Sequence, residues 1–489
     1  MITQRTLLGT VIATADSPST QKIHFVLSSD KLNAMKGEFV EIDDGRIILA
    51  LITEIQKMNA YFASADSVKV YEESTRTLQS IFPTDEWDYV VCSARPLGEL
   101  QELVRRLSFP VSPGSPVYRC RSSVLQEFLG LKKDGIQIGK IGRPPMEVSL
   151  DPTRLLQKHL AIMAISGAGK SYTVAVLLEE LLKRSQDQGR LAIVVIDPHG
   201  EYSSFVEDEG YGDVTELVKG SFIQIAVPQL SAYKIREFAP DITEVQLRTL
   251  EQIYKMLRKT GKAFSFKEVI EAINQVKEVK QTTKDSLMSR LLGLENTTFF
   301  GYEENPNLDH LLSPGKLNII DLSEIISSYK KQLLTTYICR RLFELRRKQK
   351  IPPFLLIIEE AHQFCPEGTA TSKTIIETIA REGRKFFAAL CLISQRPVRL
   401  STTALSQCNT HLIMRIRNPN DLDHIALTSE GIDRASLKIL PDLEIGEALI
   451  VGNAVNYPMF FRVRTRTSRP SRFELSLEEA ARLYEHRET

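Results

Sequence analysis

The sequence lacks an excess of charge of either sign. Its 489 residues include 62 Lys and Arg against 61 Asp and Glu, which leaves a formal net charge of +1. Binding of nucleic acid over a whole protein surface needs a large surplus of basic side chains, so the composition excludes a histone-like protein. It is compatible with a protein whose basic and acidic side chains are segregated on different faces.

Long hydrophobic runs are also missing. The longest, such as residues 191–196 and 354–358, have the length of β-strands and fall well short of the ~18 residues that a membrane helix needs. The first residues carry neither the basic segment nor the apolar core of a secretory signal. We therefore expect a cytoplasmic protein with no membrane segment.

Cysteine is scarce and unpatterned. None of the six cysteines forms a CxxC pair, and none has a histidine nearby at the spacing of a metal site. Scattered cysteines of this kind are typical of free thiols buried in a reducing cytosol. The residues concerned are Cys92, Cys120, Cys339, Cys365, Cys391 and Cys408.

The first 150 residues are rich in short β-type runs. Residues 37–42 and 47–55 are two such runs joined by an Asp-Gly turn, which is the signature of a β-hairpin. Several short strands at close spacing indicate a small barrel. Pro and Gly then become frequent towards residue 150, so we predict an N-terminal β-barrel domain over residues 1–150.

From His159 onwards the pattern becomes α/β. An apolar run, a glycine loop, an amphipathic helix and the buried run 191–197 form one βαβ unit, which requires a parallel sheet. Residues 231–312 are charged and helix-patterned, and we interpret them as a helical insertion. The prediction is a RecA-like P-loop ATPase core over residues 151–460, followed by a C-terminal arm over 461–489. Further strand runs lie at 317–322, 354–360, 388–394 and 411–416.

The glycine loop is the strongest functional signal. Residues 164–171 fit a Walker A motif, except that Ala164 stands where the first glycine usually does. Glycines let backbone N–H groups turn inward around phosphate, Lys170 would reach the β- and γ-phosphates of ATP, and Ser171 would bind Mg²⁺. A chance GxGKS is the alternative, but the preceding strand and following helix favour a real site. The predicted nucleotide contacts are Ser166, Gly167, Ala168, Gly169, Lys170, Ser171 and Tyr172.

Two adjacent carboxylates end the apolar run 354–358. Buried carboxylates at a strand end are costly unless they face a cation and a polarised water. Glu359 is then the Walker B acid that holds Mg²⁺, and Glu360 is the base that activates the attacking water, which implies hydrolysis. The alternative is the solvated start of a helix, where acidic residues favour the helix dipole.

Three further motifs follow predicted strands or helices. Asp197 and Glu201, with His199 between them, could support Mg²⁺ or the lytic water, or could simply form a capped turn. Arg381 and Arg384 could act as arginine fingers towards a neighbouring subunit, or belong to a plain charged helix end. Gln395 suits a sensor of the γ-phosphate, or is an ordinary polar residue at a strand end.

Together these ordered motifs resemble the HerA branch of the HerA/FtsK superfamily, from about residue 155 to 455. The resemblance implies a hexameric ring ATPase, using ATP and Mg²⁺, that translocates double-stranded DNA through its central channel. One departure is Lys158, where close relatives often have an arginine. If that arginine acts across the subunit interface, lysine keeps the charge but loses the planar fork. By motif, the resemblance assigns roles to Lys170, Ser171, Glu359, Glu360, Gln395 and Arg381.

Contacts with DNA are left open by the sequence. A translocase needs basic side chains on loops that line its pore, and Lys373, Arg396 and Arg399 are candidates, or are solvated loop charges. If residues 461–467 form a strand, the side chains of Arg462, Arg464 and Arg466 share one face. That face could brace a neighbouring subunit, meet DNA or protect an exposed edge from aggregation.

The resemblance also implies partners. It suggests a NurA-like nuclease in DNA end processing, or an effector such as a sirtuin-like NADase or a nuclease in antiviral defence, with the β-barrel as docking surface. One nucleotide site per chain and a finger that is useless within its own subunit imply assembly, and the resemblance implies that the assembly is a homo-hexamer. The alternative is a ring that scaffolds and switches an effector, with ATP hydrolysis secondary. A motor for secretion or conjugation is disfavoured by the missing membrane segment.

Overall fold

A computed structural model gives the arrangement of most of the chain. It describes residues 5–29, 34–59, 66, 69, 88–100, 104–105, 107–142, 144–276, 279–471 and 477–485. The chain divides into two compact units. One comprises Met1–Lys132 and Lys140–Glu147, and the other Lys133–Gly139 and Val148–Thr489.

The first unit is built around a closed β-barrel. Six antiparallel strands close because β2 pairs with both β1 and β5, and closure leaves no exposed edge to aggregate. The predicted hairpin is confirmed: β3 pairs with β4 across a turn in which Gly45 adopts a φ of 71°. The barrel strands are β1 (Leu7–Ile12), β2 (Ile23–Leu27), β3 (Phe39–Asp43), β4 (Ile47–Asn59), β5 (Asp88–Leu100) and β7 (Pro116–Arg119).

Alternate side chains of these strands fill the interior of the barrel. Leu8, Ile23, Phe25, Ile42 and Ile48 are fully buried there, as the period-2 alternation of a β-strand requires. The short strand β6 (Val104–Arg105) pairs antiparallel with the end of β5, and helix α3 (Ser122–Leu129) follows the barrel. Buried apolar residues therefore give this unit a core of its own.

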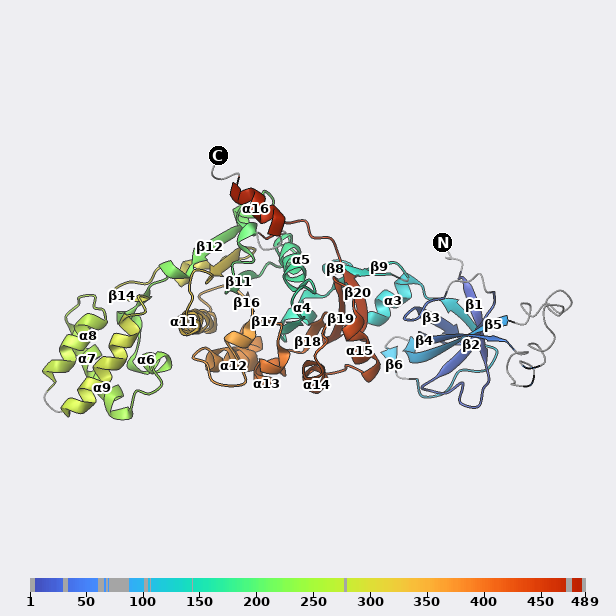
Figure 1. Ribbon diagram of the computed structural model, residues 1–489, viewed down its shortest axis with the longest axis horizontal. Helices are drawn as coiled ribbons and strands as arrows, with labels where there is room; N and C mark the ends of the chain where they lie inside the picture. Colours follow the sequence, from blue (N-terminus) through green and yellow to red (C-terminus); the bar gives the residue numbers. More distant parts are fainter. Residues whose placement is uncertain are drawn as a thin grey trace. The chain divides into compact units, whose positions relative to one another are not determined.

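The second unit contains an eleven-stranded sheet (Figure 1). Its order is β12-β15-β11-β16-β17-β10-β18-β19-β20-β8-β9, in which the pairs from β12 to β18 are parallel and those joining β18, β19 and β20 are antiparallel. The strands are β8 (Ile136–Ile141), β9 (Met146–Leu150), β10 (Leu160–Met163), β11 (Ala192–Asp197), β12 (Thr215–Lys219), β15 (Leu317–Asp321), β16 (Phe354–Ile358), β17 (Ala388–Ser394), β18 (Thr410–Ile413), β19 (Glu447–Gly452) and β20 (Met459–Val463).

The strand order brings the predicted motifs to one edge of the sheet. Strand β17 lies between β10, which leads into the glycine loop, and β16, which leads into the paired carboxylates. Their carboxyl ends are in register, because Met163 pairs with Ser394 and Ile358 with Leu392. This is the RecA-like arrangement expected from the sequence, and ligands bind at this edge in open parallel sheets.

Helices complete the core. α5 begins directly at the glycine loop, and α11 begins at a capping serine, Ser327, whose side chain accepts the N–H of Lys330. Arg346 in the last turn of α11 donates to the carbonyls of Phe386 and Ile351, so the basic end of this helix has a structural role. The core helices are α4 (Pro152–Leu156), α5 (Lys170–Leu182), α11 (Ser328–Arg347), α12 (Lys373–Glu382), α13 (Thr402–Leu405), α14 (Pro419–Thr428) and α15 (Arg434–Ile439), and α16 (Leu477–Glu485) lies near the C-terminus.

The segment that follows β13 (Ile225–Ala226) is mainly helical. Figure 1 shows α7, α8 and α9 gathered into a bundle, and a two-stranded parallel pair, β13 with β14 (Phe300–Gly301), joins its two ends. Capping boxes at Thr243 and Ser265 start α7 and α8. The helices are α6 (Ala232–Phe238), α7 (Glu244–Lys259), α8 (Phe266–Gln275), α9 (Gln281–Glu295) and α10 (Leu308–Leu311).

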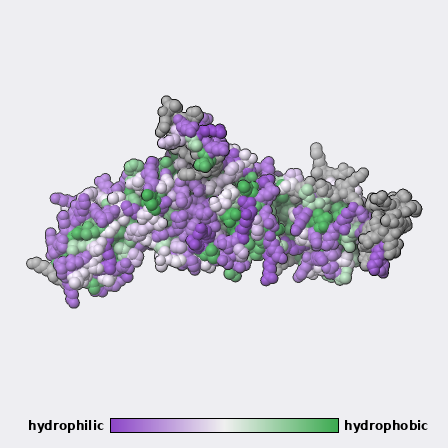
Figure 2. Space-filling view, viewed as in Figure 1, coloured by the Kyte–Doolittle hydropathy of each residue, from purple (hydrophilic) through white to green (hydrophobic). Residues whose placement is uncertain are grey.

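The surface agrees with the ordinary composition. On the face shown in Figure 2, hydrophilic residues predominate and hydrophobic residues form small separate patches. No helix of the described residues has both the length and the hydropathy needed to cross a membrane. All six cysteines are free and buried, as the sequence predicted.

Candidate active site

The glycine loop joins β10 to α5 in a conformation that depends on glycine. Gly167 and Gly169 have φ angles of 75° and 98°, a left-handed region that other residues adopt at a cost. Ala164 stands where a first glycine is usual, and its backbone N–H donates to the carbonyl of Ser394, so it continues the strand. A strand residue needs no special φ, which explains why alanine fits there.

Lys170 lies between the two predicted Walker B carboxylates. Its Nζ is 2.6 Å from Oε1 of Glu359 and 2.5 Å from Oε1 of Glu360. Burial by itself would lower the pKa of Lys170, but the two carboxylates more than offset that effect and raise it above its ordinary value. The three residues therefore form one buried charged cluster at the start of the P-loop helix.

Glu359 is fully buried at the end of β16. Its Oε2 accepts a hydrogen bond of 2.8 Å from the hydroxyl of Tyr202, which is also buried. Burial raises the pKa of Glu359 to about 7, against the opposing charge of Lys170. Glu360 follows in the left-handed region, with a φ of 48°, where few non-glycine residues lie. The backbone thus turns sharply and presents the second carboxylate beside the first.

The segment 197–202 contributes to the site in two different ways. Asp197 accepts the backbone N–H groups of His199, Gly200 and Tyr202, so this carboxylate caps the turn. Glu201 instead accepts a hydrogen bond from the Ser171 hydroxyl and thus reaches the P-loop. The side chain of His199 is exposed. The geometry therefore favours the interpretation of Asp197 as the cap of a turn over a role in supporting Mg²⁺ or the lytic water.

Gln395 directly follows β17 and is half-buried between the glycine loop and the Walker B segment. Two neighbours that the sequence analysis did not assign also belong here. Tyr202 holds Glu359, and His362 lies 3.2 Å from both Oε2 of Glu360 and Oγ of Ser394. Tyr202 directly follows Glu201, and His362 lies two residues after Glu360, so their closeness in sequence to the predicted site residues was the available signal.

Three basic residues with predicted roles, Lys158, Arg381 and Arg384, lie at the opposite edge of the sheet, near the amino ends of its strands. His159 precedes β10; its Nε2 donates to the carbonyl of Ala380 and its Nδ1 accepts the N–H of Leu390, each at 3.0 Å. Arg381 is the next residue after Ala380, Lys158 directly precedes His159, and both are exposed, as is Arg384. Because β10 has four residues, this edge is roughly 13 Å from the glycine loop. The chain does not bring these cations to its own P-loop.

The candidate DNA contacts differ in their surroundings. Lys373 is the first residue of α12, and its Nζ donates to the carbonyls of Glu367 and Gly368 at 2.7 and 3.0 Å. The ammonium of Lys373 therefore binds its own loop, which favours a structural role for this residue over a contact with DNA. Arg396 and Arg399 are exposed beyond β17, so both remain candidate contacts with DNA.

The segment after β20 packs against the P-loop helix. Strand β20 ends at Val463, so Arg462, Arg464 and Arg466 do not share a strand face. Arg464 pairs with Glu179 at 2.8 Å and with Glu180 at 2.7 Å. The backbone N–H groups of residues 467 and 468 also donate to Glu179. This segment braces its own chain.

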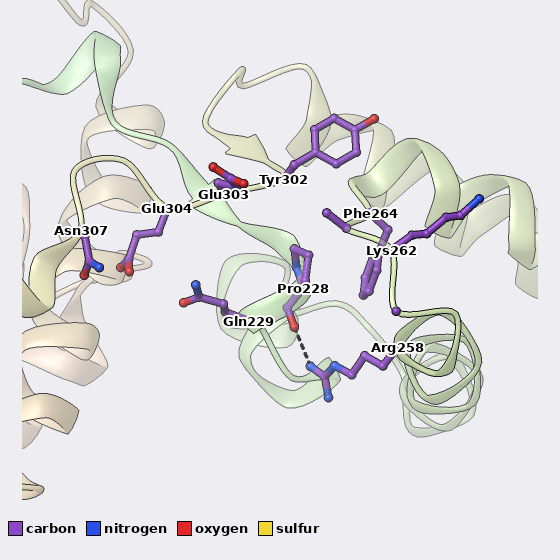
Figure 3. A pocket seen from close by; sticks show the side chains of 11 residues that line it. Pro228, Gln229, Arg258, Lys262, Phe264, Tyr302, Glu303, Glu304 and Asn307 are labelled. Carbon is purple, nitrogen blue, oxygen red and sulfur yellow. Dashed lines mark hydrogen bonds between the residues drawn. The ribbon is translucent and has the colours of Figure 1, made fainter.

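A cavity of about 540 Å³ lies away from the P-loop, beside the helical insertion (Figure 3). Several of its polar groups bind neighbours: Arg258 donates to the carbonyl of Pro228, and the Tyr302 hydroxyl donates to Glu268. Glu304 accepts from Tyr337 and Arg341. We assign no function to this cavity.

The P-loop residues suit Mg²⁺. In the described part of the chain, no group of three or more His, Cys, Asp and Glu side chains is placed to hold a metal ion alone. Magnesium bound with a nucleotide needs only one or two protein oxygens, since phosphates and waters complete its shell. The Ser171 hydroxyl and the buried Glu359 carboxylate are oxygen ligands of the right kind on either side of Lys170.

Comparison with known proteins identifies relatives in sequence and in fold. The family model described as helicase HerA, central domain, matches residues 136–342. The DNA double-strand break repair helicase HerA of Pyrococcus furiosus is 28% identical over 88% of this chain and 88% of its own length. The "Probable helicase MJ1565" of Methanocaldococcus jannaschii is 30% identical over 80% of this chain and 79% of its own length.

Solved structures show the same fold at low identity. VirB4 of Thermoanaerobacter pseudethanolicus has a TM-score of 0.53 at 16% identity, over 68% of this chain and 97% of its own. Plasmid coupling protein TrwB in complex with ADP and Mg²⁺ has a TM-score of 0.50 at 14% identity, over 72% and 94%. These structures show the fold alone. The family match and the sequence relatives show that the chain belongs to the HerA family, ATP-hydrolysing P-loop enzymes of the DNA helicase and translocase type.

Proposed function

We propose that this chain is one subunit of a hexameric ring that hydrolyses ATP with Mg²⁺ and thereby moves double-stranded DNA through its channel. The observation that carries the ATPase part is the buried cluster of Lys170, Glu359 and Glu360 beside the glycine loop. A lysine and two carboxylates are costly to bury, and a triphosphate with its cation accounts for all three.

The residues act in a definite order. When a nucleotide enters, the loop N–H groups and Lys170 bind its phosphates, because a triphosphate carries more negative charge than the carboxylates that hold the ammonium in its absence. Lys170 then leaves Glu360, whose Oε1 becomes free to accept a proton from the attacking water. Gln395, at the end of the intervening strand, orients that water or the γ-phosphate.

Magnesium would be held by Ser171 and Glu359, and when bound it would neutralise charge on the β- and γ-phosphates. Glu201 orients the Ser171 hydroxyl, and Tyr202 orients Glu359. These contacts place the oxygen ligands before the ion arrives.

A ring is proposed because the nucleotide site within one subunit is incomplete. Phosphoryl transfer needs a cation at the γ-phosphate, and Arg381, Arg384 and Lys158 lie at the far edge of their own subunit. In a closed ring that edge can face the P-loop of a neighbour, which makes each site complete only in the assembly.

The proposed substrate rests on the relatives, and the proposed partners rest on the resemblance of the motifs. Several relatives are named as DNA double-strand break repair helicases, which supports a role on broken duplex ends; the resemblance adds a NurA-like nuclease as partner. An effector in antiviral defence, such as a sirtuin-like NADase or a nuclease, is the other partner class that the resemblance implies. The exposed Arg396 and Arg399 supply cations that a ring would repeat around its channel.

A translocation assay tests the proposal. The ring, identified by native mass spectrometry, should displace a third strand from a DNA triplex in the presence of ATP and Mg²⁺, and Lys170→Ala should abolish displacement. If the wild-type ring hydrolyses ATP but never moves on duplex DNA, it is an effector scaffold and the translocase proposal is wrong.

A further inference from the structure

A chain of polar contacts runs from Glu360 to the loop after β17. Oε2 of Glu360 lies 3.2 Å from Nδ1 of His362, and the same Nδ1 lies 3.2 Å from Oγ of Ser394. That Oγ in turn accepts the backbone N–H of Arg396 at 3.0 Å. The Walker B carboxylate and the exposed Arg396 are thus joined through two side chains.

His362 is placed to orient the carboxylate. It lies in the short 3-10 helix Ala361–Gln363, directly after Glu360, and its side chain is only 12% exposed. Burial lowers its pKa, so the ring is neutral and carries one N–H. Nδ1 is hydrogen-bonded to the Ser394 hydroxyl and lies 3.2 Å from the unsatisfied Oε2 of Glu360, so a small rotation of the ring would turn a proton on Nδ1 towards that carboxylate.

Glu360 needs such a partner. Its two oxygens have different surroundings: Oε1 is held by Lys170, whereas the buried Oε2 accepts no hydrogen bond and lies 3.2 Å from Nδ1 of His362. Once a nucleotide draws Lys170 to the phosphates, His362 is the contact that still restrains the carboxylate. A base with one oxygen held and the other free is oriented for one water position.

The other end of the contact chain lies at the surface. His362 lines a cavity of about 490 Å³ together with Gln332, Val398 and Arg399. Residues Pro397–Arg399 form a single 3-10 turn, whose Val398 N–H donates to Asp421. The carbonyl of Arg399 accepts the N–H of Glu367. A contact that shifts this turn therefore acts on both Ser394 and the segment that follows His362.

We propose that His362 is the positioning residue of Glu360, and that through Ser394 it transmits to Glu360 the contact of duplex DNA with residues 396–399. This inference rests on the proposed function and deepens it, since it names how DNA would accelerate hydrolysis at this site. The coupling needs no movement of the P-loop.

Three substitutions at one position test the orienting role. His362→Ala should lower kcat for ATP about tenfold or more and leave KM within about twofold, as for other residues that hold a reacting group. His362→Asn places an amide N–H near the position of Nδ1 and should recover most of kcat, whereas His362→Gln, whose amide reaches the position of Nε2, should not. The exposed His310 of α10 provides the matched control, His310→Ala.

The coupling is tested by the ratio of ATP turnover with and without duplex DNA. Ser394→Ala should lower this ratio about fivefold, and the double variant with His362→Ala should show no further loss, since both act in one contact chain. Equal kcat for the Ala, Asn and Gln variants of His362, or independent effects of the two positions, would overturn the inference. An inactive wild-type ring would instead refute the proposed function.

Discussion

The carboxyl ends and the amino ends of the strands form two opposite edges of the core sheet, and these edges carry charge in opposite ways. At the carboxyl edge, Lys170 is buried and neutralised by Glu359 and Glu360 within 2.6 Å. At the amino edge, Lys158, Arg381 and Arg384 are exposed around the buried His159. The difference teaches that a subunit contains the acidic half of its site, while its exposed basic residues lie far from its own P-loop; in the proposed ring they would serve a neighbour. An isolated subunit is therefore expected to bind nucleotide but to hydrolyse it slowly.

The largest effect is expected at the carboxyl edge. Glu360→Gln keeps the shape of the side chain but removes its basicity, so kcat for ATP should fall about a thousandfold. Binding of a non-hydrolysable ATP analogue, measured by calorimetry, should be unchanged or tighter, because Lys170 loses a competing charge. Turnover that survives the substitution would show that Glu360 is not the base.

The next effect tests the amino edge. Arg381→Ala should lower turnover about a hundredfold, less than the full value of an arginine finger because Arg384 remains beside it. Mixed rings of Arg381→Ala and Lys170→Ala subunits should recover activity, since some interfaces then pair an intact P-loop with an intact arginine. If activity is recovered at no ratio, Arg381 does not act across the interface and the comparison of the two edges fails.

A stability measurement tests the related contrast between a buried ion pair and a solvated one. Arg464 pairs with the buried Glu179 behind the P-loop, and Arg464→Ala should lower the free energy of unfolding by about 3 kcal/mol because a carboxylate loses its partner. The matched control is Arg462→Ala, whose pair with Glu444 is solvated and should cost under about 1 kcal/mol. Chemical denaturation measures both. Equal losses of unfolding free energy in the two variants would contradict a bracing role for Arg464.

The smallest effect concerns pH. Burial lowers the pKa of His159 to about 4 from 6.5, so protonation favours the unfolded chain. The stability that the neutral ring contributes is present above pH 6.5 and is lost as pH falls towards 4, by about 1 kcal/mol at pH 5.5. His159→Asn should flatten the dependence of the unfolding free energy on pH in this window. A slope that stays the same would assign the loss to other groups, such as the buried His411, whose pKa is also lowered to about 4.

The sequence was sufficient for the parts of the site that follow strand ends. Lys170 and Glu360 are 190 positions apart, yet the rule that parallel strands end at one edge predicted their meeting. The left-handed φ of Gly167 and Gly169 follows equally from the loop motif. In each case local pattern and global topology agree, and a motif then carries three-dimensional information.

Other contacts could not be predicted because they depend on how irregular segments pack. Tyr202 and His362 reach the carboxylates from turns whose side-chain directions have no sequence period. The brace by Arg464 appears because β20 ends at Val463, and strand ends are poorly determined by sequence. The ammonium of Lys373, which is held by its own loop, shows that a basic residue in a polar segment need not be free to meet phosphate.

The six buried cysteines make the chain convenient for single-molecule spectroscopy. Burial raises the pKa of Cys92 to about 11 and those of Cys339 and Cys365 to about 12, so these thiols stay protonated and react slowly with maleimides at neutral pH. One exposed cysteine introduced at Ile326, which is 98% exposed, could therefore be labelled without first removing the native ones. A fluorophore there would follow individual rings through their ATP cycle.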